Sequence, residues 1–126
     1  MKKIIYSLII IISIVTIGIF TKNEEVSAMK LTMTINDQVV AVDWADNAAV
    51  TKLKHQASQA PVKITTHAYG GFEQVGKLPS SLPTNDQELQ AKPGDLMLYQ
   101  GNQLVAFHGH NEWAYTRLGH LTGLSK

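Results

Sequence analysis

The fold is constrained most by residues 92–110, a stretch that predicts a β-hairpin with two apolar faces. Pro93-Gly94 indicates a turn, and residues 95–100 and 103–108 then form the two expected strands around the two-residue loop Gly101-Asn102. A loop of that length fixes the cross-strand pairs, which are Leu98 with Val105, Leu96 with Phe107, Tyr99 with Leu104, Met97 with Ala106, and Asp95 with His108. Because both faces are mostly apolar, we expect the hairpin to lie at the centre of its sheet, with something packed on each side.

A second hairpin and a helix are expected upstream. Residues 30–35 and 38–44 alternate apolar and polar side chains around the turn candidate Asn36-Asp37, in a register that pairs Met33 with Val40. The core-facing residues of the second strand are then Val40, Val42 and Trp44. Asp46-Asn47 next suits a helix cap, and Pro61 ends the helix. Its apolar residues Val50, Leu53 and Ala57 predict a short amphipathic helix that covers an open face of a sheet.

The remaining segments predict more strands. Residues 62–69 alternate until Gly70-Gly71, and residues 115–121 form a last strand, interrupted by Gly119, after a connection at 109–114. Residues 72–92 are read as one long loop, either functional or a crossover pinned by Leu78, Leu82 and Leu89. Together these elements predict a mainly β fold, a small closed or nearly closed β-barrel with one short α-helix.

The N-terminal residues 1–28 predict a leader, which leaves residues 29–126 as the folded domain. A basic start precedes the uncharged, apolar residues 4–20, and Val26-Ser27-Ala28 fits a signal peptidase site. An uncleaved anchor is the first alternative, because these residues would span roughly 25 Å as a helix, just short of a bilayer core. A helix buried in the core is the second. We therefore expect a secreted or extracytoplasmic protein, or one held on the membrane by residues 4–20.

The composition of residues 29–126 excludes several classes of protein. There is no cysteine, which rules out disulfides, thiol catalysis and thiolate metal sites. The eight Lys and Arg residues balance eight Asp and Glu residues, and no basic patch indicates a nucleic-acid partner. We expect a monomer without a cofactor, which contacts a membrane only through the N-terminal segment.

Three segments resemble the bacterial cyclophilin-like domain family. They are GFEQVGKLPSSLP at 71–83, KPGDLMLYQGNQLVAFHG at 92–109 and EWAYTRLGHL at 112–121. The likeness runs from about Met29 to Leu121 and implies a compact barrel related to cyclophilin, with less helix. It implies no settled activity, since the function of that family is largely uncharacterised.

The resemblance raises the question of prolyl isomerase activity. An isomerase lowers the amide rotation barrier with an apolar pocket for the proline ring and a hydrogen-bond donor, usually Arg, at the proline nitrogen. Cyclophilins carry Phe-His-Arg and Phe-Met-x-Gln-Gly-Gly segments. Here Phe107-His108 is followed by Gly109, and Arg117 is the sole arginine of the sequence. We assign the catalytic arginine to no position and expect a non-catalytic module for an extended peptide or small ligand, with an extracytoplasmic isomerase as the alternative.

Aromatic side chains suggest where such a ligand binds. Phe72, Tyr99, Phe107, Trp113 and Tyr115 suffice to line a shallow cleft, although Phe107 is expected to be core and the others could also fill the barrel. The ligand-binding residues that we predict are Phe72, Glu73, Tyr99, His108, Trp113 and Arg117.

Two histidine arrangements remain as alternatives. If the strand stayed extended, His108, His110 and Glu112 would share a face, as metal ligands can, although solvated side chains are expected there. If Asp95 pairs with His108, the pair is a general base, a pH-sensitive clasp or an ordinary surface ion pair, and we expect the last. His55, His67 and His120 are read as bystanders.

Overall fold

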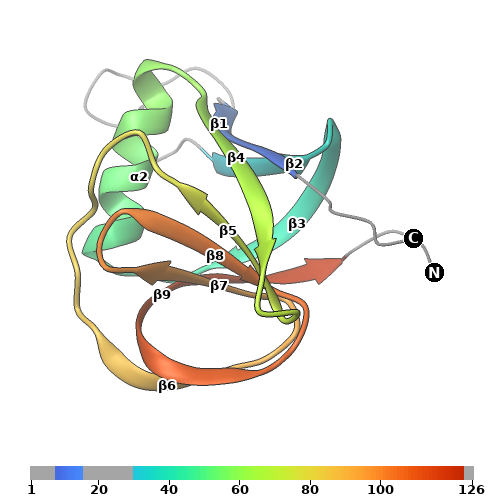
Figure 1. Cartoon of the computed structure of the whole chain (residues 1–126). Coiled ribbons are helices and arrows are strands. Elements are labelled where there is room, and N and C mark those ends of the chain that lie inside the picture. The colour runs from blue at the N-terminus through green and yellow to red at the C-terminus, as the bar shows by residue number, and fades with distance from the viewer. Residues whose placement is uncertain (1–7, 16–29, 124–126) are drawn as a thin grey trace.

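The computed structural model describes residues 8–15 and 30–123. Within them lie nine strands and one helix: β1 (Ile9–Val15), β2 (Lys30–Ile35), β3 (Gln38–Trp44), α2 (Ala48–Gln59), β4 (Val62–Tyr69), β5 (Glu73–Lys77), β6 (Gln87–Ala91), β7 (Asp95–Tyr99), β8 (Gln103–Phe107) and β9 (Asn111–Gly123). The sheet order β3-β2-β1-β4-β5-β8-β7-β9 forms a ring that the β3–β9 pairing closes, and β6 adds to β9 outside it (Figure 1). The predicted mainly β barrel with one short helix is confirmed.

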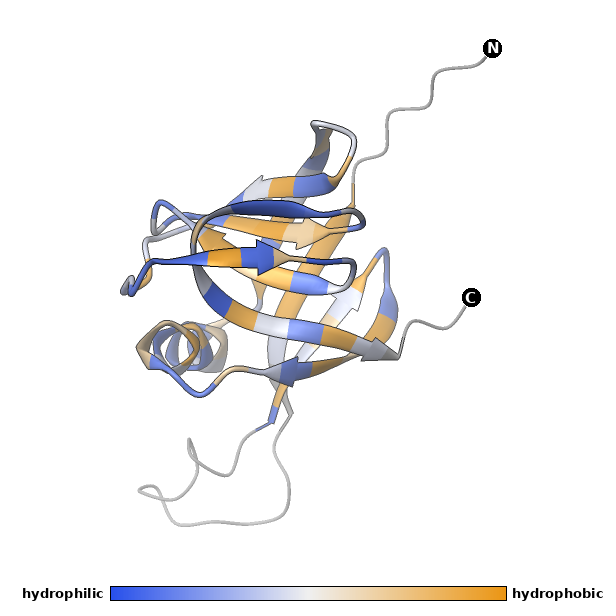
Figure 2. Ribbon diagram, turned by 90° about the horizontal axis from the view of Figure 1, so that it is seen from below, coloured by the Kyte–Doolittle hydropathy of each residue, from blue (hydrophilic) through white to orange (hydrophobic). Residues whose placement is uncertain are grey.

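The first predicted hairpin and the helix are confirmed in detail. Met33 pairs with Val40, and the turn residues Asn36 and Asp37 have φ values of 50° and 69°, as a tight hairpin turn requires. Asn47 caps α2 by accepting a hydrogen bond from the Val50 amide at 2.9 Å. The buried residues of the helix are Ala49, Val50, Leu53 and Ala57, and its apolar side faces the sheet (Figure 2).

The central hairpin β7–β8 is confirmed, but its predicted register is wrong by one residue. Tyr99 pairs with Gln103, so the loop has three residues, and Gln100 and Gly101 take φ values of 52° and 76°. Leu96 and Leu98 consequently face the barrel interior with Leu104 and Ala106, whereas Met97 and Tyr99 face outward with Val105 and Phe107. The expectation that both faces are covered is correct.

The single loop predicted at 72–92 is wrong, because it contains β5 and β6. β5 pairs with both β4 and β8, and β6 pairs with β9. β5 does not look like a strand in the sequence because it contains Gly76, a residue type that is rare inside strands. Glycine is needed there because a Cβ would lie 2.5 Å from a methyl carbon of Ile64. Leu78 and Leu82 are buried as expected, and they pin the shorter connection between β5 and β6.

The last strand is longer than predicted. β9 begins at Asn111, inside the segment expected to be a connection, because residues 111–115 pair with β6. β6 and residues 111–115 together form an arm that crosses the outside of the barrel, below β7 and β8 in Figure 1. We call this two-stranded segment the β6–β9 arm.

Residues 9–15 of the predicted leader form β1, which lies between β2 and β4 and is antiparallel to both. Ile10 and Ile12 point into the core and are fully buried. The alternative of a helix buried in the core is therefore wrong for this segment. Residues 1–7 and 16–28, with the cleavage site, lie outside the described residues, and cleavage or anchoring stays a prediction. In the part of the chain that the structure describes, no helix is both long and apolar enough to cross a membrane.

Candidate functional site

The barrel has a second, smaller apolar cluster on its outer face. Met97, Val105 and Phe107 from the sheet pack there against Ala91 and Tyr115 of the β6–β9 arm. The Phe107 ring meets the Tyr115 ring edge-on at a centroid distance of 5.5 Å and stacks with Phe72 at 6.3 Å. The aromatic cluster therefore holds the arm against the sheet.

A pocket of about 520 Å³ opens beside this cluster, between the sheet and the arm. That volume is in the range of small-ligand sites. Five aromatic side chains line it, namely Tyr69, Phe72, Tyr99, Trp113 and Tyr115, together with the carboxyl group of Glu73. Alternation along the strands explains the gathering: Tyr69 pairs with Glu73, and Glu73 with Phe107, so these side chains share the outer face of the sheet.

Glu73 is a buried carboxyl group in the wall of the pocket. The residue is 7% exposed, and its Oε1 has no hydrogen-bond partner among residues 8–15 and 30–123. Burial raises the pKa of Glu73 from 4.5 to about 7, because the charged form loses its solvation. Near neutral pH this group therefore lies between its acid form and its carboxylate form.

Tyr115 adds a polar group to the same wall. Its hydroxyl oxygen accepts a hydrogen bond from Nδ2 of Asn111 at 2.8 Å. Burial raises the pKa of Tyr115; the Asn111 hydrogen bond opposes that rise, and the nearby Glu73 and Tyr99 add to it. The phenol therefore stays protonated and offers a hydroxyl group inside an otherwise aromatic wall.

Glu73→Gln is expected to stabilise the protein by up to about 3 kcal/mol above pH 7 and to change stability little below pH 4.5. The folded protein favours the neutral carboxyl group, so ionisation in the unfolded chain draws the equilibrium toward unfolding as the pH rises from 4.5 to about 7. Urea denaturation at the two ends of this range measures the difference. Glu88→Gln, at an exposed carboxyl group of β6, is the control. An equal effect of Glu73→Gln at both pH values would contradict the prediction.

A second buried carboxyl group, Asp95, lies at the start of β7 and is fully buried. The predicted pair with His108 is wrong: Asp95 Oδ1 lies 2.8 Å from Nδ1 of His120 and 3.4 Å from Nη1 of Arg117. Asp95 Oδ2 accepts a hydrogen bond from the Lys92 amide at 3.0 Å. Burial alone would raise the pKa of Asp95, but these hydrogen bonds and the charges of Lys92 and Arg117 outweigh it and lower that pKa.

His120 was therefore misread as a bystander. β7 and β9 pair Asp95 directly with His120, a contact between residues that are distant in sequence. A bulge at Leu96-Met97 then brings Arg117 to the same carboxylate. This cluster joins β7 to β9 and is not part of the pocket wall.

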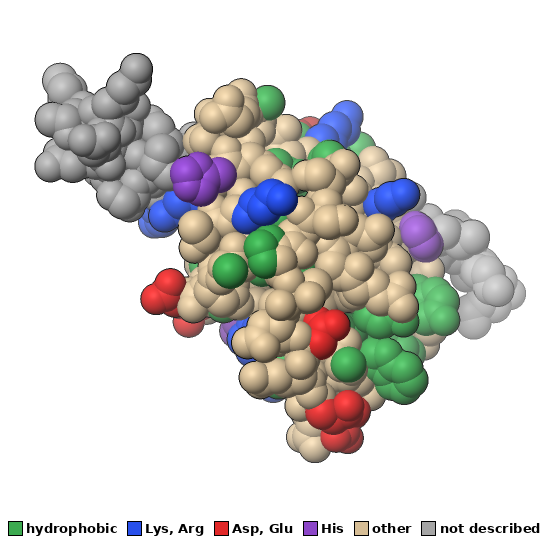
Figure 3. All heavy atoms as spheres, turned by 90° about the vertical axis from the view of Figure 1, so that its left-hand side faces the viewer, with side chains coloured by type: hydrophobic (Ala, Val, Ile, Leu, Met, Phe, Trp, Pro, Cys, Tyr) green, Lys and Arg blue, Asp and Glu red, His purple; other side chains and the backbone are tan. Residues whose placement is uncertain are grey.

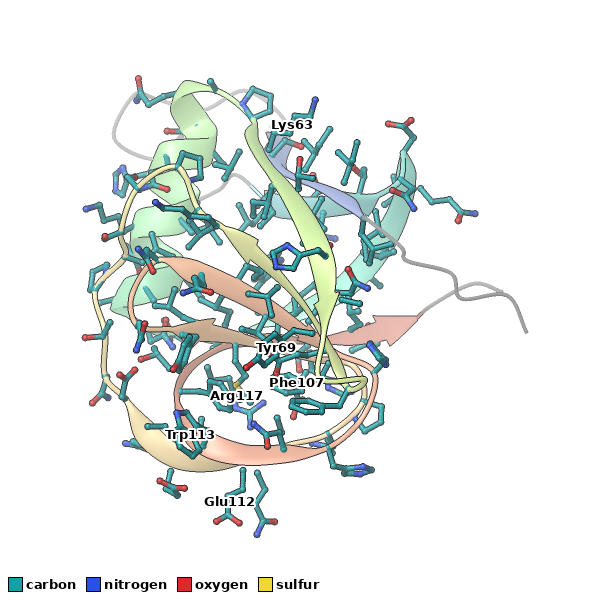
Figure 4. The ribbon with its side chains drawn as sticks, viewed as in Figure 1. Lys63, Tyr69, Phe107, Glu112, Trp113 and Arg117 are labelled. Atoms are coloured by element: carbon teal, nitrogen blue, oxygen red, sulfur yellow. The ribbon has the colours of Figure 1, made fainter. Side chains whose placement is uncertain are left out.

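The structure brings together four of the six predicted site residues. Phe72, Glu73, Tyr99 and Trp113 line the pocket. His108 is exposed in the bend after β8, and Arg117 is held by Asp95. Figure 4 shows Trp113 on the arm and Tyr69 at the end of β4, near Phe107. Tyr69 was not among the predicted site residues. The available signal was an aromatic residue at the end of a predicted strand, directly before the Gly70-Gly71 turn.

The extended arrangement considered for a metal is not formed. The chain bends at His108 and Gly109 between β8 and β9, so His108, His110 and Glu112 do not continue a single strand. Glu112 points away from the body of the molecule in Figure 4. Within the described ranges, no group of three His, Asp or Glu side chains is placed to hold a metal ion.

The ring of eight strands, with one short helix and an aromatic pocket on its outer face, defines a small β-barrel scaffold. Residues 33–126 match the family model described as the cyclophilin-like family, and the chain belongs to that family. Comparison with curated proteins and with solved structures gave no significant match.

Proposed function

We propose that this cyclophilin-like domain is a non-catalytic binding module whose ligand, an extended peptide or a small molecule, occupies the pocket under the β6–β9 arm. The observation that carries the proposal is a pocket of about 520 Å³ walled by five aromatic rings and a buried carboxyl group. Aromatic rings supply much apolar contact area with few rotatable bonds, so little conformational entropy is lost on binding. Trp113 is 54% exposed, so a ligand that covers it removes apolar surface from water.

Prolyl isomerase activity is the alternative function. It needs a donor close to the proline nitrogen, and the residues that line the pocket in the described structure include no arginine. Arg117 lies outside the pocket wall, with its Nη1 3.4 Å from Asp95 Oδ1. These two observations favour binding without catalysis.

Ligand binding is expected to shift the indole N–H resonance of Trp113 in a ¹H–¹⁵N spectrum and to leave that of Trp44 unchanged. The sequence has two tryptophans, and the Trp44 indole donates to the Leu31 carbonyl oxygen at 3.1 Å, outside the pocket. Titration with phenyl-bearing small molecules and with the peptide Ala-Ala-Pro-Phe tests the pocket, and the same peptide reports isomerisation. Tyr99→Ala should weaken binding about tenfold, the loss expected for one aromatic contact of about 1.4 kcal/mol.

The control for this titration is Val39→Ala, since Val39 is 76% exposed and lies outside the pocket. It should bind like the parent protein. Catalysed interconversion of the proline peptide would instead support the isomerase. Equal shifts of both indole resonances, or none with any ligand, would contradict a binding site at Trp113.

We also propose that the protein is exported, because a basic start, the uncharged residues 4–20 and Val26-Ser27-Ala28 together suit a signal peptide. The expected monomer stays a prediction. Charged side chains of both signs are scattered over the face in Figure 3, without a basic patch for nucleic acid.

The described residues that line the pocket come from β4, β5, β7, β8, β9 and the turn before β5, and none comes from β1. The intact mass of protein recovered from producing cells tests cleavage after Ala28, and a mass that includes residues 1–28 would show that the segment is kept.

A further inference from the structure

The pocket wall contains a buried carboxyl group, that of Glu73, without a positively charged partner among the described residues. Glu73 is buried in the wall, and its Oε1 has no hydrogen-bond partner in the part of the chain that the structure describes. A buried acceptor without a donor is costly, and native proteins seldom keep one without a reason. A ligand that brings a donor to this oxygen would remove the cost, so Glu73 indicates which chemical group the pocket receives.

The other wall residues narrow the choice of donor. Lysine and arginine are missing from the described lining, where His67 is the one basic side chain, so the pocket contains no permanent positive charge to balance a Glu73 carboxylate. Tyr69, Tyr99 and Trp113 line the pocket, and the faces of such aromatic rings attract cations. A buried acid with several aromatic rings around it is a suitable environment for an organic ammonium group.

We propose that the pocket binds ligands that carry an ammonium group beside an apolar part, with Glu73 as the counter-ion and the aromatic rings of the wall around the apolar part. This inference rests on the proposed binding function and specifies its ligand class. A lysine side chain of a peptide and a small aromatic amine share this chemistry. The pocket should reject carboxylates, because their charge would be desolvated beside that of Glu73.

The affinity for such a ligand should rise with pH. An alkylammonium group with a pKa near that of lysine stays charged at neutral pH, whereas Glu73, with a pKa of about 7, changes from mostly neutral to mostly ionised between about pH 6 and pH 8. Linkage between ionisation and binding then predicts about tenfold tighter binding at the higher pH. The titratable groups that face Glu73 are Tyr69 and His67 of β4, Tyr99 of β7 and Tyr115 of β9. A Glu73 variant is needed to assign the effect to Glu73.

The test compares probes of similar shape on the full chain. 2-Phenylethylamine, 2-phenylethanol and 3-phenylpropionate differ in charge around one phenyl group, and Trp113 indole shifts report their binding. We expect the amine to bind at least about tenfold more tightly than the alcohol at pH 8, and the carboxylate to bind most weakly. N-acetyl-phenylalanyl-lysine amide, against its Nε-acetyl-lysine form, tests whether a peptide lysine suffices.

Glu73→Gln keeps the size of the side chain and removes the charge, so it should abolish both the preference for the amine and the rise with pH. Glu88→Gln, outside the pocket, should keep both. A rise with pH that persists in Glu73→Gln would assign the pH dependence to a group other than Glu73 and overturn the role of Glu73. Equal binding of amine and alcohol in the parent protein would overturn the ammonium inference while the binding function stands. Failure of every probe to shift the Trp113 resonance would overturn both.

Discussion

Asp95→Asn is expected to lower the free energy of unfolding by about 2–4 kcal/mol, because it removes the buried charge that Arg117, His120 and Lys92 surround. The substitution keeps the shape of the side chain, so the loss is electrostatic and does not come from a cavity. Arg117 and His120 are more than one third exposed, and water partly compensates them, which sets the estimate below that for a fully buried pair. Urea denaturation of the two proteins at pH 7 measures the difference.

The pH dependence of this loss has a defined sign. The pKa of Asp95 is lowered in the folded state, so its stabilising contribution is complete above about 3.8 and is lost as the pH falls through the lower folded value. The gap between Asp95→Asn and the parent should therefore close only in strong acid. Asp46→Asn, at an exposed carboxyl group, is the control and should cost little at any pH. A loss at pH 7 no larger than that of the control would show that the cluster does not hold β7 to β9.

Residues 29–126 alone are expected to be less stable than the full chain by about 3–6 kcal/mol. Removing the leader deletes β1, and with it the fully buried Ile10 and Ile12, each worth about 1.5–3 kcal/mol of apolar burial. It also leaves β2 and β4 without their shared partner. The two strands run in the same direction, so closing the gap would require a parallel pair. Denaturant unfolding of both proteins measures the difference.

Two variants of the full chain locate the cause of this effect. The double substitution Ile10→Ala and Ile12→Ala should account for much of the loss, whereas Ile9→Ala, at a residue 38% exposed, should have a small effect. Equal stability of residues 29–126 and the full chain would mean that β1 adds nothing and that the ring closes without it.

The sequence allowed the local elements to be predicted well. The β2–β3 hairpin combines clean alternation with a two-residue turn, and α2 combines an Asn cap with an apolar stripe, so each carries its own signal. β5 and β6 carry no such signal. Gly76 interrupts the alternation of β5, and β6 is mostly polar because it pairs along a single edge, with β9. β5 and β6 form strands because they pair with strands that the sequence pattern did not identify as their partners.

The sequence allowed several residues of the pocket to be predicted, but not their arrangement in space. Phe72, Tyr99 and Trp113 could be nominated as aromatic candidates, but only the fold places them around Glu73. The register error in β7–β8 came from one loop residue, Gln100, which adopts a left-handed conformation that its sequence did not suggest. The same error placed Asp95 opposite His108, whereas its partner His120 comes from the separate pairing of β7 with β9.

If residues 1–28 direct export, as proposed above, the position of β1 couples the folding of this protein to its export. Residues 9–15 form a strand between β2 and β4, and the same residues would be the middle of the proposed signal peptide. The segment cannot be a barrel strand and a bound signal peptide at the same time. A chain whose ring closes before export would therefore bury part of the proposed signal peptide. Under this proposal, the fraction of chains exported depends on the rate of export relative to the rate of ring closure. A substitution such as Ile12→Ala, which slows ring closure, would raise that fraction.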